Sequence, residues 1–179
     1  VCVCVFSDRG GDSGAIATAN YIARKFGVKS GIPISFAKKR LGERKDAVFL
    51  PVDFDYYLGI SEKSMSIIKE NADVFEYVGK DEAYLDVTDR VKGDFDKAGH
   101  LAQQIKNSIR DKVKLSCSVG VSANKLIAKI ASDFRKPDGF TVVSPEKIEE
   151  FLEQLKIRAI PGIGKKTEER FTQMNLETI

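Results

Sequence analysis

Two acidic residues stand side by side in the segment KDEAYLDVT, where Asp81 and Glu82 fall near the bend of a predicted β-hairpin. Adjacent carboxylates repel each other, so a chain that keeps them together usually leaves them in water or supplies a cation. Mg²⁺ suits such oxygen ligands, and there it could bind a triphosphate, activate a 3′-hydroxyl and neutralise a leaving pyrophosphate. Taken alone, the pair is explained more simply as a solvated acidic turn, so the context has to decide.

A second polar group is expected on one helix. Apolar residues recur at helical spacing from about Ala15 to Phe26, and Gly27 stands where a helix normally ends. The opposite face of this predicted helix carries Thr18, Tyr21 and Arg24. A hydroxyl, a phenol and a guanidinium together suit phosphate, which arginine binds as a fork, although a solvated polar face explains them about as well.

A third group lies in IPGIGKKTEERF, which resembles the hairpin of helix-hairpin-helix modules. Gly162 and Gly164 let the backbone turn tightly and present N–H groups to a phosphate, while Lys165 and Lys166 add positive charge. Contacts of this kind do not depend on nucleotide sequence. The alternative is an ordinary turn between two helices.

Helices and strands alternate in the part of the chain that would position these residues. The pattern predicts a helix through SEKSMSIIKENA, the hairpin VFEYVGKDEAYLDVT and a long helix beginning at Asp94. It then predicts a strand alternating from Leu115 to Val121, a helix ANKLIAKIASDF capped by Ser122, and a strand FTVV. Because tight hairpins need antiparallel partners, this order predicts a mixed or antiparallel sheet with helices on one face.

Composition excludes several classes of protein. The 179 residues, 42% hydrophobic and 31% charged, can form one domain with smaller attached lobes. No apolar run approaches the roughly 18 residues that a membrane span needs, and no export signal is visible, so we expect a cytoplasmic protein without a membrane partner. Cys2, Cys4 and Cys117 have neither disulfide-framework nor zinc-site spacing. The net charge of +3 permits binding to a polyanion without requiring it.

Three motifs occur in the order that one enzyme family uses. DEAYLD, followed about forty residues later by SVGVSANKLIAKIASDFRKPDG, resembles the palm of Y-family, translesion-type DNA polymerases, and TANYIARKFGVKSGIPI resembles their fingers. The resemblance covers essentially the whole chain. It implies an α/β (α+β) fold, with a fingers lobe and part of a palm edge strand at 1–52. A palm with a ferredoxin-like mixed sheet would follow at 53–143, and a partial helical thumb with the helix-hairpin-helix at 144–179.

The resemblance also assigns roles to individual residues. It implies that Asp81 and Glu82 are the catalytic carboxylates and metal ligands, with two Mg²⁺ ions in the complete enzyme. It implies that an incoming deoxynucleoside triphosphate contacts Thr18, Tyr21, Arg24 and Lys136. The expected activity is template-directed DNA synthesis, including synthesis opposite damaged template positions, and the implied partners are primer-template DNA and deoxynucleotides. A sliding clamp would be recruited through a region beyond Ile179.

VDFDYY at 52–57 looks like the first metal motif of the same family but stands in the wrong place. It follows FLP and enters the helix before DEAYLD, where relatives carry a variable connector, so we expect Asp53 and Asp55 to be solvated or capping residues. The first strand of the family would precede VCVCVF, and its little finger domain would follow Ile179. We therefore expect this chain alone to polymerise weakly or not at all.

Two rival functions stay open. The chain could be a non-catalytic, sequence-independent DNA-binding module whose acidic pair is merely structural. It could also be another palm-type nucleotidyl enzyme, such as a nucleotide cyclase, which would have no use for the hairpin near Gly162 and would act without DNA. Magnesium-dependent incorporation of nucleotides into DNA would separate both rivals from a polymerase.

Overall fold

The protein is described by a computed structural model that covers residues 1–6 and 13–179. Its contacts divide the chain into two compact units, Val1–Tyr57 and Leu58–Ile179, which are called here the N-terminal and C-terminal units. The division into fingers, palm and thumb expected from the sequence remains a prediction. Among the described residues, no helix has both the length and the apolar character needed to cross a membrane, and all three cysteines are free.

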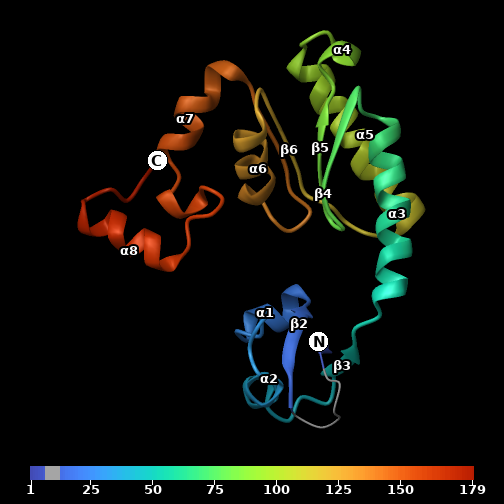
Figure 1. The fold of residues 1–179 in the computed structure, drawn as a ribbon, viewed down its shortest axis with the longest axis vertical. Helices are drawn as coiled ribbons and strands as arrows, with labels where there is room; N and C mark the ends of the chain where they lie inside the picture. The colour runs from blue at the N-terminus through green and yellow to red at the C-terminus, as the bar shows by residue number, and fades with distance from the viewer. Residues whose placement is uncertain (7–12) are drawn as a thin grey trace. The chain divides into compact units, whose positions relative to one another are not determined.

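A three-stranded sheet forms the centre of the N-terminal unit (Figure 1). Strand β1 (Cys2–Phe6) lies between β2 (Ala15–Ala19), which is antiparallel to it, and β3 (Val48–Pro51), which is parallel. Among the described residues of this unit, helices α1 (Tyr21–Lys25) and α2 (Ile34–Leu41) lie between β2 and β3 in the sequence, and the unit ends within the first turns of α3 (Phe54–Glu70). Its buried core consists of Val3, Ile16, Ala19, Ala23, Val28, Ile34, Ala37 and Leu41.

The single helix expected from Ala15 to Phe26 is wrong. Its first part is strand β2, in which Thr18 pairs with Cys4 of β1, and helix α1 begins only at Tyr21. Asn20 accounts for the break, because its side chain accepts a hydrogen bond from the N–H of Ala23 at 3.0 Å and so caps α1. Thr18 is therefore an exposed strand residue and does not share a helix face with the other two polar residues.

The C-terminal unit contains helices and short strands in the order expected from the sequence. After α3 (Phe54–Glu70) come β4 (Val74–Gly79), β5 (Glu82–Asp86), α4 (Thr88–Val91), α5 (Phe95–Val113), β6 (Val119–Ser122), α6 (Lys125–Phe134) and β7 (Phe140–Val143). The chain then continues through η1 (Pro145–Lys147), α7 (Ile148–Glu153), η2 (Ile157–Ala159) and α8 (Lys165–Gln173). The mixed α/β fold class is confirmed.

The four strands that the structure describes in this unit form two separate two-stranded ladders instead of one continuous sheet. Within the described part of the chain, β4 and β5 form an antiparallel ladder, whereas β6 and β7 form a separate parallel ladder. Strand β6 is also shorter than expected, because it begins at Val119 instead of Leu115. The residues before it bond elsewhere: the Cys117 carbonyl accepts from the Lys106 ammonium, and the Ser118 hydroxyl accepts from the N–H of Gly139.

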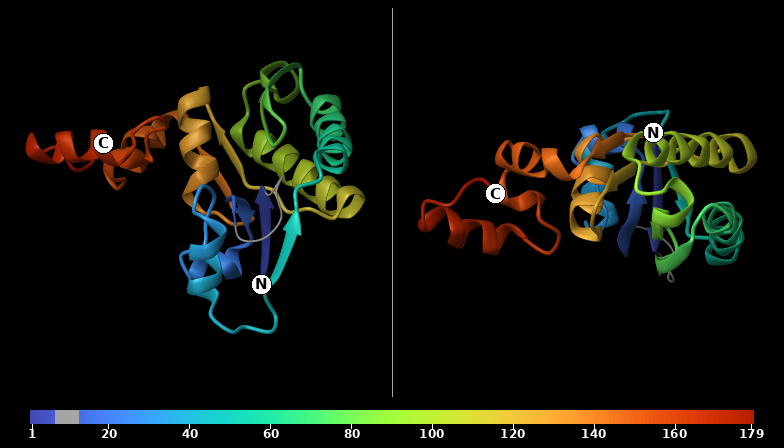
Figure 2. Two further views of the ribbon diagram at one scale, coloured as in Figure 1. Left: turned by 60° about the horizontal axis from the view of Figure 1, so that its bottom comes forward. Right: turned by 90° about the horizontal axis from the view of Figure 1, so that it is seen from above.

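Two small cores hold the C-terminal unit together. Ile67 of α3 packs with Ile105 and Ile109 of α5, and Leu85 of β5 joins them. The second core lies around α6 and contains Ile127, Ile130, Ala131, Val143, Phe151 and Leu155. Helix α6 lies directly against β6, as two further views show (Figure 2). The hairpin and α6 are thus each fixed by apolar burial.

Capping residues set the ends of the long helices. The long helix expected from Asp94 is α5, and Asp94 caps it by accepting hydrogen bonds from the N–H groups of Asp96 and Lys97. The expectation that Ser122 caps α6 is wrong. Asn124 does so by accepting from the N–H of Ile127 at 2.9 Å, and the Ser122 hydroxyl instead donates to the Val143 carbonyl. An amide one residue before the helix reaches its free N–H groups, which Ser122 on the strand cannot.

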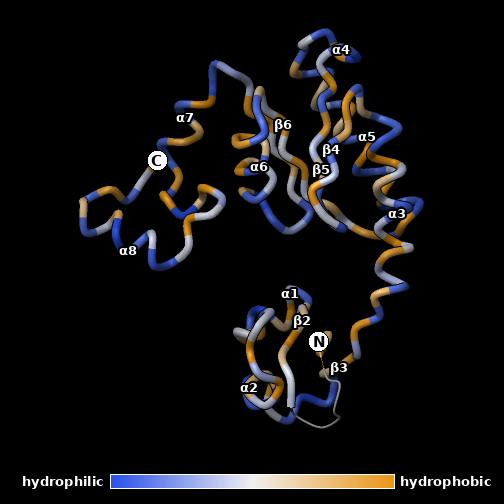
Figure 3. The backbone as a smooth tube through the Cα atoms, in the orientation of Figure 1, coloured by the Kyte–Doolittle hydropathy of each residue, from blue (hydrophilic) through white to orange (hydrophobic). Residues whose placement is uncertain are grey.

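The last part of the chain folds back on itself. The N–H of Ile157 donates to the Glu177 carbonyl, and the N–H of Ile179 donates to the Leu155 carbonyl at 3.1 Å. Helix α8 has no buried residue, and Figure 3 shows it as mostly hydrophilic. A helix of this kind leaves its polar side chains to solvent or to a partner.

Candidate active site

The adjacent carboxylates lie where the sequence predicted them. Asp81 is in the turn between β4 and β5, and Glu82 is the first residue of β5, paired with Gly79. The Ser61 hydroxyl of α3 donates to the Lys80 carbonyl and so ties this turn to the helix beneath it. Both carboxylate side chains are exposed. The hairpin therefore presents two neighbouring acids at its tip, and a hydrogen bond from α3 holds the backbone of that tip in place.

One oxygen of Glu82 has a cationic partner. The Lys129 ammonium of α6 donates to Oε1, with the Glu82 side chain 45% and the Lys129 side chain 23% exposed. Burial acts to lower the pKa of Lys129, but the hydrogen bond to Glu82 and the charges of Glu82 and Asp133 outweigh it, so this pKa lies above its ordinary value. Lys129 thus stays an ammonium beside Glu82.

The carboxylates still leave room for a cation. Across residues 1–6 and 13–179, the structure gives no hydrogen bond or ion pair to Asp81 and none to Oε2 of Glu82. The same residues contain no group of three histidine, cysteine or acidic side chains that could hold a metal. Mg²⁺ commonly binds through one or two carboxylates and takes its other ligands from water and substrate phosphates. The pair therefore fits one side of a magnesium site without completing it.

Lys136 is connected to the same carboxylates through α6. Its ammonium lies 2.6 Å from Oδ1 of Asp133, and Lys129 lies 3.5 Å from Oδ2 of that residue. Charges of alternating sign thus run from Glu82 through Lys129 and Asp133 to Lys136. Sequence reasoning missed Asp133, although its spacing of four residues from Lys129 on a helix is the usual signal for an ion pair.

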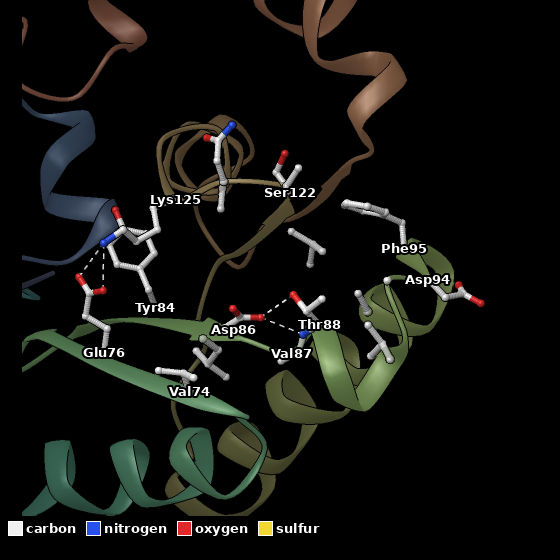
Figure 4. Close-up of a pocket in the computed structure, with 18 residues that line it drawn as sticks. Val74, Glu76, Tyr84, Asp86, Val87, Thr88, Asp94, Phe95, Ser122 and Lys125 are labelled. Carbon is white, nitrogen blue, oxygen red and sulfur yellow. Dashed lines mark hydrogen bonds and ion pairs between the residues drawn. The ribbon is translucent and has the colours of Figure 1, made fainter.

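A second ion pair joins α6 to the hairpin one helical turn earlier. Lys125 donates to both oxygens of Glu76 on β4, at 3.1 and 2.9 Å, and its ammonium lies 5.6 Å from the centre of the Tyr84 ring (Figure 4). The Lys125 side chain is 63% exposed. Like the Lys129–Glu82 pair, it joins a lysine of α6 to a glutamate of the hairpin, but it lies away from the hairpin tip.

The hairpin and the start of α6 also line a cavity of about 580 Å³. Figure 4 shows Glu76, Tyr84 and Lys125 together on one side of it, with Asp94 and Phe95 on the opposite side. Asp86 lines it as well, and its carboxylate accepts hydrogen bonds from the hydroxyl and the N–H of Thr88. The bond from the hydroxyl, followed by the bond from the N–H, lowers the pKa of Asp86. None of the predicted catalytic or nucleotide-binding residues lines this cavity. The carboxylates at the tip are thus separate from it.

A buried lysine holds the turn that follows Lys136. Lys106 of α5, only 4% exposed, lies 2.6 Å from Oδ1 of Asp138, 3.1 Å from its carbonyl and 3.3 Å from the Gly139 carbonyl. Arg110 adds a bond of 2.9 Å to the other carboxylate oxygen. The hydrogen bond from Lys106, assisted by the positive charges of both residues, lowers the pKa of Asp138 against the opposing effect of burial.

Replacing Asp138 by asparagine should remove part of the acid sensitivity of the fold. A carboxylate whose pKa is lowered by folding adds stability above the pKa of about 4 that it has when unfolded, and that contribution disappears as the pH falls through the folded value. Asp138→Asn should therefore lower the urea midpoint at pH 7, and the difference between the two midpoints should shrink as the pH falls below the ordinary carboxyl pKa of about 4. Asp111→Asn, a change of an exposed carboxylate on α5, should leave the midpoint unchanged. Parallel curves for Asp138→Asn and the parent chain would contradict this assignment.

In the N-terminal unit, Tyr21 and Arg24 lie one turn apart on the short helix α1. The guanidinium carbon of Arg24 is 5.1 Å from the centre of the Tyr21 ring, and its Nε donates to the Ala19 carbonyl at 2.9 Å. Both side chains are exposed, as is Thr18 on the preceding strand. The Arg24 side chain is therefore held in place by the end of β2 and by the Tyr21 ring.

The glycine-containing turn before α8 has the backbone that the sequence predicted. Gly162 adopts φ +92°, which side-chain-bearing residues rarely reach, and Gly164 is the N-cap residue of the helix. Lys165 and Lys166 begin α8 and are exposed, with Lys165 located 3.8 Å from Glu169. Both lysines thus stand at the end of the helix where backbone N–H groups are free to bind an anion.

The interpretation of VDFDYY as a connector agrees with the contacts of its first aspartate. Asp53 accepts a hydrogen bond from the N–H of Tyr56 at 2.9 Å and so caps α3, while Asp55 is exposed in the first turn of that helix. Both residues belong to the N-terminal unit. A capping aspartate and an exposed one are what the sequence predicted here.

Comparison with known families adds an independent observation. Residues 1–133 match the impB/mucB/samB family, and residues 145–176 match the helix-hairpin-helix motif described for the same family. The second match covers the segment that contains Gly162, Gly164, Lys165 and Lys166. Together the two matches account for nearly the whole chain.

Individual relatives agree with these matches. The chain is 80% identical to DNA polymerase IV of Nitrosopumilus maritimus over 179 residues, which are all of this chain and 49% of that protein. It is 45% identical to DNA polymerase IV of Saccharolobus solfataricus over 179 residues, or 50% of that protein. The chain thus spans about half the length of these relatives.

Solved structures give the same result. The insertion ternary complex of Dbh DNA polymerase superimposes with a TM-score of 0.91 at 40% identity, covering 99% of this chain and 51% of that one. DinB from Sulfolobus solfataricus superimposes equally well, with a TM-score of 0.91 at 40% identity over 99% of this chain and 50% of the other.

Proposed function

Because the chain belongs to the impB/mucB/samB family, we propose that a full-length protein carrying it is a DNA polymerase that extends a primer opposite a template, including damaged template positions. The observation that carries the proposal is the exposed Asp81–Glu82 pair at the tip of the β4–β5 hairpin. Asp81 has no partner among the described residues, and its neighbour keeps one oxygen available. Similarity over the whole chain to proteins named DNA polymerase IV gives these acids their context.

In this proposal Asp81 and Glu82 hold divalent cations, with Mg²⁺ as the ion that their hard oxygens suit. The bound ions would supply charge neutralisation for the triphosphate and the departing pyrophosphate. The chain's own contribution is to hold two negative charges side by side on an anchored turn. Glu82 would lie nearest the primer 3′-hydroxyl and Asp81 would be the metal ligand beside it.

The roles proposed for the remaining residues follow from the resemblance to Y-family DNA polymerases. Lys136 would contact phosphates of the incoming nucleotide from the C-terminal unit, and Thr18, Tyr21 and Arg24 would contact the nucleotide from the N-terminal unit. The stacking of Arg24 beside Tyr21 supports this role, because it orders a guanidinium that can bind phosphate as a fork.

The turn before α8 would bind the DNA backbone. Gly162 and Gly164 shape the turn, and Lys165 and Lys166 supply charge at the free N–H groups of the helix start. A helix whose side chains are all at least partly exposed agrees with such a surface. Binding of this kind would hold primer-template DNA without reading its sequence.

The two rival functions are less well supported. A non-catalytic DNA-binding module would have no need of an acid such as Asp81, which has no cationic partner among the described residues, since an unpaired carboxylate repels phosphate. A nucleotide cyclase would need the acids but not the glycine turn, which falls in the segment that matches the family's helix-hairpin-helix motif. A sliding clamp as partner and a cytoplasmic location stay part of the proposal, to be tested by clamp pull-down and cell fractionation.

Primer extension tests the proposal directly. A full-length protein should extend a labelled primer only when template, deoxynucleotides and Mg²⁺ are all present, because the carboxylate pair needs a cation to bind triphosphate. EDTA should abolish extension and excess Mg²⁺ should restore it, and a template with an abasic site should still support insertion. The chain of 179 residues alone should bind DNA weakly and extend poorly.

Two outcomes would contradict the proposal. DNA binding by the full-length protein without incorporation under any divalent cation would favour the binding module. A nucleotide product formed from triphosphate in the absence of DNA would favour a cyclase.

A further inference from the structure

We propose that Lys129 is a positioning residue for Glu82: it holds the carboxylate toward α6 and competes for it with a divalent cation. The inference rests on the proposed function, because it concerns the residue that this function places beside the primer terminus. Lys129 lies within the motif SVGVSANKLIAKIASDFRKPDG, but the predicted catalytic and nucleotide-binding residues do not include it.

The contacts of Lys129 point in two directions. Its ammonium donates to Oε1 of Glu82 on the hairpin and lies 3.5 Å from Oδ2 of Asp133 on its own helix. Asp133 in turn lies 2.6 Å from the ammonium of Lys136. One lysine is therefore shared between a carboxylate that would bind metal and a carboxylate that holds the phosphate-binding lysine.

The surroundings of Lys129 distinguish it from an ordinary surface lysine. Its side chain is 23% exposed, whereas that of Lys125, which forms the neighbouring pair with Glu76, is 63% exposed. Helix α6, which carries both lysines, is fixed by the burial of Ile127, Ile130 and Ala131. Lys129 thus extends from a rigid base, so its contact can hold the Glu82 carboxylate in one orientation.

Two effects of opposite sign follow from this arrangement. The ammonium occupies one oxygen of Glu82 and places a positive charge beside it, so it must weaken the binding of a divalent cation to the free protein. The same contact removes rotational freedom from the carboxylate, so it must help the complete site to reach its working geometry. A lysine with only a structural role would not produce these two opposite effects together.

The test compares Lys129→Met with Lys125→Met in a full-length protein. Both changes remove one ion pair between α6 and the hairpin, but only the first touches Glu82. Mn²⁺ binding in the absence of DNA and nucleotide is measured by electron paramagnetic resonance of the free ion, since carboxylate and water ligands suit Mn²⁺ and Mg²⁺ alike. The turnover number for primer extension is then measured at saturating Mg²⁺, together with the thermal midpoint of each variant.

We expect Lys129→Met to bind Mn²⁺ about 2- to 5-fold more tightly, the range expected for loss of one partly exposed ion pair. Its turnover should nevertheless fall about 10-fold, because the carboxylate is no longer held in place. Lys129→Arg, which keeps a charged donor, should recover most of the turnover. Lys125→Met should match the parent protein in Mn²⁺ affinity and turnover, and the two methionine variants should have similar thermal midpoints.

Unchanged or weaker Mn²⁺ binding by Lys129→Met would overturn the inference, as would the same behaviour in Lys125→Met. Glu82→Gln separates this failure from failure of the proposed function. If Glu82→Gln does not weaken Mn²⁺ binding, Glu82 is not a metal ligand and the proposed function loses its site. If Glu82→Gln weakens binding while Lys129→Met leaves it unchanged, the metal site stands and only the role of Lys129 is lost.

Discussion

Asp81→Asn in a full-length protein should reduce primer extension at least about 100-fold, the size of effect seen when one preorganised electrostatic group is removed from an active site. Asparagine keeps the shape of the side chain but loses the charge that would hold a cation at the hairpin tip. Asp81 makes no hydrogen bond or ion pair with the described residues, so the change removes no contact from the fold. Single-turnover extension at saturating DNA and nucleotide measures the loss.

Two other acids serve as controls for this substitution. Asp55→Asn alters the VDFDYY segment, which looks like a metal motif but enters α3, and Glu76→Gln alters a carboxylate on the same hairpin that pairs with Lys125. Both variants should extend primers at the parent rate. Full activity of Asp81→Asn, or loss of activity in Asp55→Asn with the fold intact, would mean that the metal site has been assigned to the wrong acids.

Gly120→Ala should lower the stability of the C-terminal unit by about 3 kcal/mol or more, near the upper end of the usual cost of overpacking. A Cβ atom at Gly120 would lie 2.1 Å from the Ala128 carbonyl oxygen and 2.4 Å from the Ser132 nitrogen. Both are backbone atoms of α6, so the helix must move away from β6 to admit a methyl group. The thermal midpoint followed by circular dichroism should fall by roughly 6–12 °C.

Gly59→Ala provides the matched control in the same unit. Gly59 lies within α3, and nothing stands within 4 Å of a Cβ atom added there. Alanine is more favourable than glycine in a helix interior, so this variant should be more stable than the parent chain by about 0.5–1 kcal/mol. Equal stability of Gly120→Ala and the parent chain would show that α6 does not approach β6 as closely as the structure places it. Because α6 also carries Lys129, the Gly120 variant should lose primer extension along with stability.

Much of the C-terminal unit could be predicted from local rules. Valine and aromatic residues on either side of a turn identify the β4–β5 hairpin, and they place Asp81 at its bend whatever the rest of the chain does. Asp94 identifies the start of α5, because a short acidic side chain is the natural acceptor for the first N–H groups of a helix. These features depend on a few neighbouring residues.

The segment around Thr18 shows where such rules fail. Small apolar residues in ATAN fit a helix face and a buried strand about equally well, and spacing alone could not decide between them. Pairing with β1 favours the strand, and that pairing joins residues that are distant in sequence. Asn20 was the available signal, since an asparagine in that position ends one element and caps the next.

The sequence by itself determined which chemical groups the chain carries and which short element bears each of them: adjacent acids at a turn, a tyrosine and an arginine one helical turn apart, and a glycine turn followed by lysines. Only the tertiary structure decided which distant groups meet. Lys129 reaches Glu82 across 47 positions of the chain, and Lys106 reaches Asp138 across 32. The physical reason is that local conformation follows from neighbouring residues, whereas contacts between distant residues follow from how apolar faces pack. Helix α6, for example, packs closely on β6 because Gly120 has no side chain.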